Sequence, residues 1–499
     1  MKKTSLFHLQ EPSPNQTLLE RGIAAYKRGD LKQAVEDLRA VVRGEPKNAE
    51  ALSWYGYVLL RQGSIKEAIP YLERAVVLQP ENPDSMTNLG NALLLKPDRT
   101  ADDTRRSLTL FQQAVQKAPD SPQMHYNLGY ALARTTQYSR AVVEYRRSLE
   151  LDPQNGLAWT NLGYALLKLD KRGDAADALR KGISLFPQDA TTWVLLGALE
   201  AANGNKTASR KALESARKLE PGNAALLTSI GRVYASMEDY SEAIEAYESA
   251  AKLAEAAPNP DKEDQVLPRY NLGVTLARQG KFSEALSTFE QVIAAAPKHY
   301  DARINAGYVL FRQGNKPGAV EKFKEATQIA PKEPLGWTNL AAACESVENW
   351  SGAVYAWRKA AALQPDNYEF GAQAAVNLMR MEKMGDAIQT YKELAQRFPK
   401  KADPYVSLGN LYEVRAQAEK EAEGNRKWLA AALAVYEEGL RREPKSAAAR
   451  ENVLRLRPVI SAQGRPVREP VRETPKPEAP TAPVVPAPEK PGNARGFPL

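Results

Sequence analysis

The hydrophobic positions of this chain repeat at an interval of 34 residues. Proline marks the interval most clearly, because Pro153, Pro187 and Pro221 are each 34 residues apart. Insertions of 5, 8 and 11 residues lengthen three of the units. Aligned on such prolines, residues 15–446 divide into twelve units that begin at residues 15, 49, 83, 122, 156, 190, 224, 266, 300, 334, 368 and 402. A fixed period of this length predicts a repeat architecture.

The pattern within one unit predicts two helices. Apolar residues at positions 4, 7, 8 and 11 fall on one stripe of a helix that turns about 100° per residue. Small residues at positions 8 and 20 let the two helices approach closely, and large residues at positions 4 and 24 fill the space beside them. Glycine or a polar residue near position 15 predicts the turn, and proline at position 32 ends the second helix. We therefore expect helical hairpins that bury their apolar faces by stacking.

The same letters return at these positions. Leu-Gly stands at positions 7 and 8, as in Leu162-Gly163, alanine at position 20, as in Ala175, and an aromatic ring at position 24, as in Tyr145 and Phe289. This pattern resembles the tetratricopeptide repeat over about 430 of the 499 residues. The resemblance implies an all-α fold, a right-handed α-solenoid superhelix whose first helices line a concave wall. It also implies a non-enzymatic scaffold or adaptor.

The two ends of the chain differ from the repeats. Residues 447–457 have helical spacing, and we expect a capping helix that seals the twelfth unit. Residues 458–499 are rich in proline, which predicts a disordered tail with polyproline-II character. Residues 1–14 are expected to form a short N-terminal arm.

Composition argues against several classes of function. Lys and Arg exceed Asp and Glu by 68 to 60, and both signs are mixed along the chain, which disfavours a basic nucleic-acid coat. The single cysteine, Cys344, excludes an internal disulfide, and three separated histidines make a metal site unexpected. Cys344 stands in the apolar stripe, so we interpret it as a core thiol. We predict no enzyme, no cofactor and no metal.

The sequence pattern also predicts no transmembrane helix and no signal peptide. No stretch approaches 18 consecutive apolar residues, and the N-terminal apolar stretch is too short for a signal peptide. We therefore expect a cytoplasmic protein with no membrane insertion.

The candidate binding site follows from positions 6, 9 and 13, which lie opposite the apolar stripe of the first helix. An asparagine column can hydrogen-bond the backbone of an extended peptide, tyrosine adds flat apolar contact, and Arg or Lys favours acidic residues. This resembles the asparagine ladder of peptide-binding tetratricopeptide superhelices. The predicted peptide-binding residues are Asn88, Asn127, Asn161, Asn271, Asn305 and Asn339 at position 6, Tyr57, Tyr130, Tyr164 and Tyr308 at position 9, and Arg61, Arg134, Lys168, Arg278 and Arg312 at position 13.

Alternatives remain open at this level. Asparagine at 6 and a basic residue at 13 are near the family consensus, so the column could be a solvated groove without a ligand. The basic row could instead follow the phosphates of a nucleic acid, although acidic residues at position 2 oppose this. The lack of lysine at position 5 disfavours the carboxylate clamp of cochaperones.

The expected partner is a protein that presents an extended segment. The residue usage suggests a bacterial source, where such arrays serve envelope assemblies such as pilus, secretion or motility machines. A homodimer through the terminal repeats is a further option, because the wall residues Glu20 and Ile23 of the first unit depart from the pattern. The insertion at residues 257–266 could act as a bend between two halves.

Overall fold

The computed structural model describes residues 14–257 and 262–461. The N-terminal arm, except for its last residue, and the tail beyond Ser461 lie outside this range. The chain divides between Gly222 and Asn223 into two units. This division separates the sixth repeat from the seventh and lies one repeat before the insertion at 257–266.

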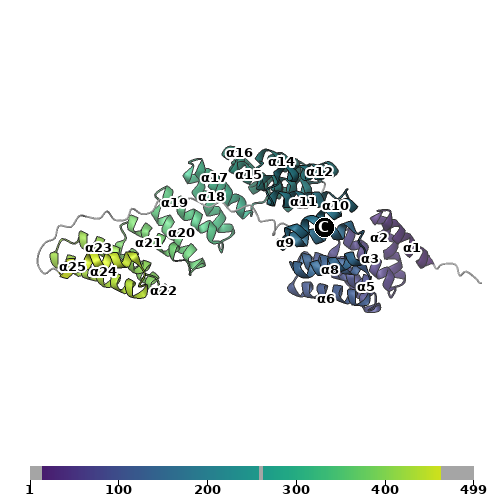
Figure 1. Ribbon diagram of the computed structural model, residues 1–499, viewed down its shortest axis with the longest axis horizontal. Coiled ribbons are helices and arrows are strands. Elements are labelled where there is room, and N and C mark those ends of the chain that lie inside the picture. The colour runs from purple at the N-terminus through teal and green to yellow at the C-terminus, as the bar shows by residue number, and fades with distance from the viewer. Residues whose placement is uncertain (1–13, 258–261, 462–499) are drawn as a thin grey trace, which may run out of the picture. The chain divides into compact units, whose positions relative to one another are not determined.

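The first unit consists of helical hairpins, in which each helix packs against the next one along the chain (Figure 1). Its helices are α1 (Pro14–Lys27), α2 (Leu31–Gly44), α3 (Ala49–Arg61), α4 (Ile65–Leu78), α5 (Pro83–Leu95), α6 (Ala101–Lys117), α7 (Pro122–Arg134), α8 (Tyr138–Leu151), α9 (Gly156–Lys168), α10 (Arg172–Leu185), α11 (Ala190–Ala202) and α12 (Lys206–Leu219).

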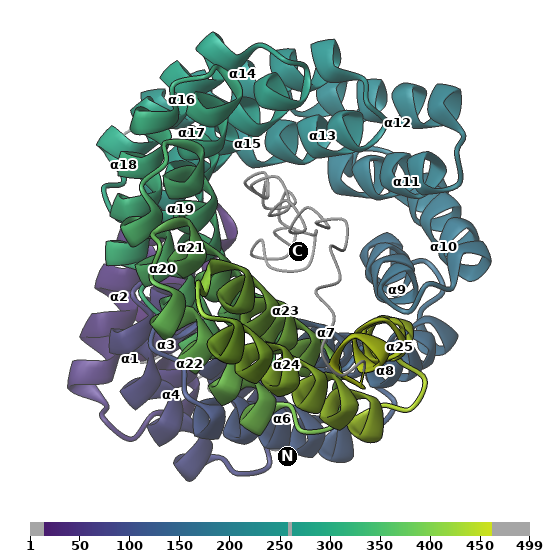
Figure 2. The ribbon, with the colours of Figure 1, turned by 90° about the vertical axis from the view of Figure 1, so that its left-hand side faces the viewer.

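The second unit continues the same pattern, and Figure 2 shows its helices following one another in chain order. Its helices are α13 (Ala224–Ser236), α14 (Tyr240–Ala256), α15 (Lys262–Arg278), α16 (Phe282–Ala295), α17 (Tyr300–Arg312), α18 (Lys316–Ile329), α19 (Pro334–Ser346), α20 (Trp350–Leu363), α21 (Tyr368–Arg380), α22 (Met384–Arg397), α23 (Asp403–Ala418), α24 (Ala422–Arg442) and α25 (Ala447–Ser461). The described residues form helices and no strands, as the all-α class requires.

In the ten hairpins whose turn carries no insertion, the turn passes through a left-handed residue at position 15. Glycine serves in five turns, for example Gly280 with φ of 85°. Thr136, Glu238 and Glu348 hold the same conformation with φ between 58° and 64°, although a side chain disfavours it. The turn geometry is therefore set by the packing of the two helices, and glycine is its easiest occupant and not a requirement.

The link from one hairpin to the next is held by two kinds of hydrogen bond. A side chain before the first helix accepts from the helix N-terminus, as when Asn48 Oδ1 accepts from the amide of Ala51 at 3.0 Å. The ring of the residue at position 4 also donates to the carbonyl of the preceding proline, as when Trp159 Nε1 donates to Pro153 at 3.0 Å. His125 Nε2 lies 3.0 Å from the Pro119 carbonyl in the equivalent place.

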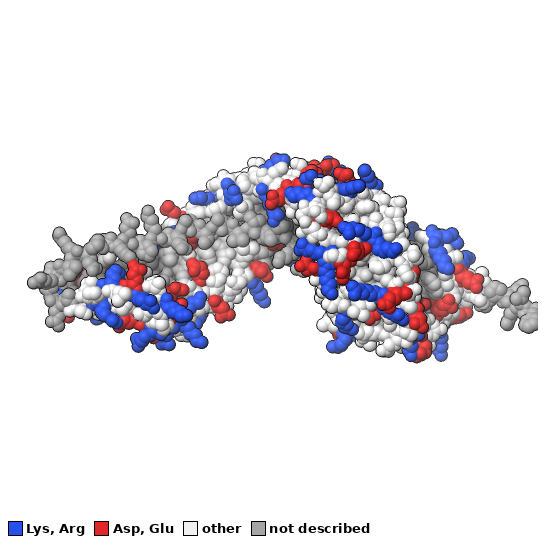
Figure 3. Space-filling model, viewed as in Figure 1, with Lys and Arg blue, Asp and Glu red and all other residues white. Residues whose placement is uncertain are grey.

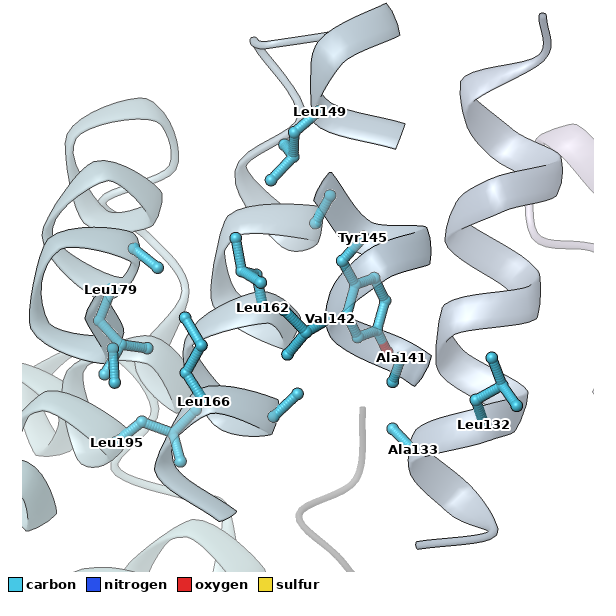
Figure 4. Close-up of a cluster of buried hydrophobic side chains, with 14 of the residues drawn as sticks. Leu132, Ala133, Ala141, Val142, Tyr145, Leu149, Leu162, Leu166, Leu179 and Leu195 are labelled. Carbon is cyan, nitrogen blue, oxygen red and sulfur yellow. The ribbon is translucent and has the colours of Figure 1, made fainter. Parts of the chain in front are cut away.

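Each hairpin is closed by the small residue at position 8 against the large residue at position 24. A Cβ atom added to Gly129 would lie 2.8 Å from Cδ1 of Tyr145, and one added to Gly307 would lie 2.7 Å from Cε1 of Phe323. The rings of Tyr145 and Phe323 are fully buried. Figure 4 shows the core around Tyr145, where α7, α8 and α9 contribute side chains to one cluster. Each such cluster therefore joins neighbouring repeats, as this one does from Leu94 to Leu199.

The last helix is longer than the sequence predicts. We expected a capping helix over 447–457 and a tail from Pro458, but α25 continues to Ser461 with Pro458 inside it. Arg455 on α25 donates to Glu413 on α23 through Nη1 at 2.8 Å and Nη2 at 2.5 Å. Tyr436 donates to the same carboxylate. This bonded group anchors the helix to the twelfth repeat.

The close approach at position 8 leads to a paired prediction. Gly307→Ala forces a methyl group against Phe323 and should lower the free energy of unfolding by about 1–3 kcal/mol. Gly385→Ala, on α22 where no atom lies within 4 Å of the added Cβ, should leave it unchanged or raise it slightly. Urea denaturation followed by circular dichroism measures both, and an equal effect of the two substitutions would contradict the role of position 8.

Candidate functional site

The side chains of positions 9 and 13 meet on the exposed side of the first helices, which we call the wall. In the first unit, the Lys168 ammonium lies 5.3 Å from the centre of the Tyr164 ring, and the Arg134 guanidinium lies 6.0 Å from the Tyr130 ring. These four side chains are half-buried. Because the residues are four apart on one helix, each cation covers the ring one turn before it.

The second unit has the same arrangement on α17. The Arg312 guanidinium lies 5.7 Å from the ring of Tyr308 and 5.2 Å from the ring of Phe282, and its Nη1 donates to the Tyr308 hydroxyl at 2.6 Å. Arg278, one repeat earlier, is exposed but has buried Val274 at position 9 in place of tyrosine. We call each pair of a ring and a cation a rung.

The structure adds a ring that the sequence analysis missed, at position 17 where the second helix begins. Phe282 of α16 contacts Arg312 of the next repeat, and Trp350 of α20 lies 4.5 Å from the Arg380 guanidinium. Tyr138 contacts Tyr164 edge to face in the same way. The recurrence of an aromatic residue at position 17 was visible in the sequence, but only stacking of the repeats brings it to the rung.

The asparagines at position 6 do not form the exposed column that the sequence predicts. Asn161, Asn271, Asn305 and Asn339 are buried, with 1–7% of each residue exposed. Asn161 Nδ2 donates to the Tyr126 hydroxyl at 2.9 Å, and Asn305 Nδ2 donates to the Tyr270 hydroxyl at 3.1 Å. Position 6 faces the first helix of the preceding repeat, so its amide joins neighbouring repeats.

Two asparagines of the column remain partly exposed. Asn88 Nδ2 lies 3.4 Å from Ser53 Oγ of the preceding repeat. Asn127 Oδ1 accepts from Gln123 on its own helix at 2.8 Å. Of the six predicted amides, these two are the ones that a ligand on the wall can reach.

Charge is distributed in two rows along the wall. Acidic residues lie in the first turn of several first helices, for example Glu50 and Asp84, and basic residues lie in the last turn, for example Arg61. The rows are about 16 Å apart, because positions 2 and 13 are separated by 11 residues of helix. Both placements also suit the helix dipole. Figure 3 shows the two signs interspersed over the face in view.

Other chemistry is sparse in the described part of the chain. Cys344 is buried, and burial raises the pKa of its thiol to about 11. His125 is buried and places Nδ1 2.8 Å from Glu144 Oε2. Among the described residues, no group of three His, Cys, Asp or Glu side chains is arranged to hold a metal ion. Within the same ranges, no helix combines the length and the apolar composition needed to cross a membrane.

Comparison with known proteins identifies the repeat. Models of the tetratricopeptide repeat match residues 19–98, 99–156 and 270–334, residues 222–298, and residues 144–180. No curated protein matches the chain.

Several solved structures are similar to parts of the chain. A tetratricopeptide repeat protein from Parabacteroides merdae is 18% identical, with a TM-score of 0.42 over 52% of this chain and 98% of that one. A thermophilic repeat protein from Thermus thermophilus is 18% identical, with a TM-score of 0.34 over 37% and 98%. MamA from Desulfovibrio magneticus is 21% identical, with a TM-score of 0.31 over 35% and 95%.

The buried amides predict a stability effect. Asn305→Ala leaves the buried Tyr270 hydroxyl without this donor and should lower the free energy of unfolding by about 1–3 kcal/mol. Asn127→Ala removes only a bond within one helix and should change it by less than about 0.5 kcal/mol. Chemical denaturation compares the two variants, and equal losses would show that position 6 does not join the repeats.

The raised pKa of Cys344 predicts an inert thiol. At about pH 8 the side chain stays protonated, and a thiol reagent should label the folded protein far more slowly than the unfolded protein in urea. Mass spectrometry measures both rates. Rapid labelling of the folded protein would show a reactive cysteine.

Proposed function

Since the chain belongs to the tetratricopeptide repeat family, whose members generally act as non-enzymatic protein-interaction scaffolds, we propose that its wall binds an extended segment of a protein partner. The observation that carries the proposal is the rung. Lys168 beside Tyr164 and Arg312 beside Tyr308 are held in place by the helices that carry them. A rigid ring and cation lose little conformational freedom when a ligand binds.

The chemistry of a rung favours a peptide with acidic side chains. The cation attracts a carboxylate, and the tyrosine ring packs against the apolar part of the same segment. Asn88 and Asn127 add an amide that can donate to, or accept from, the peptide backbone. Because the rungs of α7 and α9 lie on successive repeats of the first unit, an extended chain can contact both.

The acidic row disfavours a ligand that is negatively charged along its whole length. Glu50 and Asp301 lie in the first turns of α3 and α17, whose last turns carry Arg61 and Arg312, so a polyanion that follows these two cations also meets carboxylates. A protein segment with both acidic and neutral residues suits this pair of rows better than a nucleic acid does. We place such binding in assembly of a bacterial envelope complex, on the residue usage of the chain alone.

Photo-crosslinking tests where the partner binds. A benzophenone amino acid in place of Tyr130 on α7 should crosslink a protein partner from a cell extract, and mass spectrometry should locate the crosslink in an extended acidic segment. The matched control is Val143, which is 63% exposed on α8 of the same repeat. Equal crosslinking from Val143 would show that the partner does not bind at the wall.

Charge reversal tests the rungs themselves. Arg134→Glu combined with Lys168→Glu should weaken partner binding about tenfold or more, while Lys181→Glu, an exposed residue of α10, should leave it unchanged. A salt titration separates the alternative, because binding to nucleic acid falls steeply with ionic strength. Retention of an oligonucleotide with such a slope, and of no protein, would overturn the proposal.

A further inference from the structure

Two arginines of the second unit lie over aromatic rings of the repeat before their own. The Arg312 guanidinium on α17 lies 5.2 Å from the ring centre of Phe282 on α16. The Arg380 guanidinium on α21 lies 4.5 Å from the ring centre of Trp350 on α20. Both arginines stand at position 13 of their repeats, and both rings stand at position 17. We call Arg312 and Arg380 the ring-supported arginines.

The rings hold the guanidinium and leave its edge available. A guanidinium that lies over a ring directs its N–H donors within its own plane, away from the ring face. Arg312 is fixed further, because its Nη1 donates to the Tyr308 hydroxyl at 2.6 Å. Its Nε and Nη2 have no hydrogen-bond partner among the described residues. These two nitrogens form the edge that can donate to both oxygens of one carboxylate.

The fold supplies no carboxylate to either of these arginines. Within residues 14–257 and 262–461, neither Arg312 nor Arg380 makes an ion pair. Arg303 on the same helix as Arg312 is different, because it is buried and its Nε donates to Glu325 at 3.0 Å. Arg312 is exposed and Arg380 is half-buried. The arginine inside the array is thus neutralised by the chain, and the two on the wall are available to the carboxylates of a ligand.

The repeat between the two arginines has small side chains on its wall. Its positions 9 and 13 are Ala342, which is buried, and Ser346, whose hydroxyl donates to the Ala343 carbonyl at 2.7 Å. Packed helices have axes about 8–10 Å apart, so two repeats separate the arginines by about 16–20 Å. An extended peptide covers this distance in about five or six residues. Because its side chains alternate between two faces, a separation of six places both on the same face.

We propose that Arg312 and Arg380 bind two carboxylates that stand six residues apart in one extended partner segment. The proposal rests on the proposed function and names the ligand of the wall in the second unit. One guanidinium matches the single charge of a carboxylate, and Asp301 and Glu369 in the first turns of α17 and α21 disfavour the second charge of a phosphate. Phe282 and Trp350 are positioning residues, since they act through the arginines that they support.

Peptide binding to the full chain tests the spacing. Fluorescein-labelled peptides of one neutral background carry two glutamates six residues apart, two glutamates two residues apart, or two glutamines six residues apart. A fourth peptide carries phosphoserine in place of the two widely spaced glutamates. Fluorescence anisotropy should show that the widely spaced glutamate peptide binds at least about tenfold more tightly than the next two, because only its carboxylates reach both arginines at once. The phosphoserine peptide should bind no more tightly than the widely spaced glutamate peptide.

Substitutions show where the widely spaced peptide binds. Arg312→Lys and Arg380→Lys keep the charge but lose the planar edge, and each should weaken binding about fivefold. Phe282→Leu should weaken it about threefold with the charge unchanged, whereas Phe282→Tyr, which keeps a ring, should bind as the unmodified chain does. Arg358→Lys, at an exposed residue of α20, is the matched control and should have no effect. Thermal melting is measured for every variant.

Each result decides the proposal. Weaker binding by both lysine variants, with melting unchanged, supports it even where Phe282→Leu unfolds. Equal binding of the narrowly and widely spaced glutamate peptides, or tighter binding of the phosphoserine peptide, would overturn it. Binding that is lost only in the Arg134→Glu and Lys168→Glu variant would overturn it and leave the proposed function standing. Failure of every peptide to bind would count against both.

Discussion

The contact between position 8 and position 24 is the constraint on which the rest of this structure depends. The two helices of a hairpin approach so closely that Gly129 and Gly307 have no room for a side chain, and the opposing rings of Tyr145 and Phe323 are buried as a result. Two of the repeats have alanine at position 8, at Ala341 and Ala375, with Trp357 and Tyr391 opposite. The close approach sets the angle between the helices, and therefore which faces remain for the neighbouring repeat and for the wall.

The contacts between repeats then determine which polar side chains are buried and which remain exposed. An amide at position 6 lies beside the first helix of the preceding repeat, where a hydroxyl at position 5 accepts its proton, as in Asn161 with Tyr126 and Asn305 with Tyr270. Buried polar groups need such partners, and a paired amide fixes the register of one repeat on the next. The column that resembles a ligand-binding ladder is therefore in large part a set of bonds between repeats.

The wall that remains for ligands is made of rings and cations. The rings and cations of the rungs, at positions 9 and 13, stay partly exposed, and an aromatic ring at position 17 of the preceding repeat contacts Tyr164 and Arg312. Where Trp54 replaces asparagine, the wall becomes aromatic. Substitutions at positions that do not contribute to the packing of the hairpin thus give different repeats different surface chemistry.

The amino-acid sequence by itself determined the helical hairpin, its stacking and its family, because the 34-residue period records residues that must be small, large or apolar at fixed places. It also indicated that Cys344 lies in the core and that the cations of α7, α9 and α17 lie on the wall. Only the tertiary structure decided that four of the six asparagines are buried, that α25 runs through Pro458, and that Phe282 reaches Arg312. The reason is physical: helical periodicity gives the direction of a side chain from its own axis, whereas burial and pairing depend on how closely the neighbouring helix approaches.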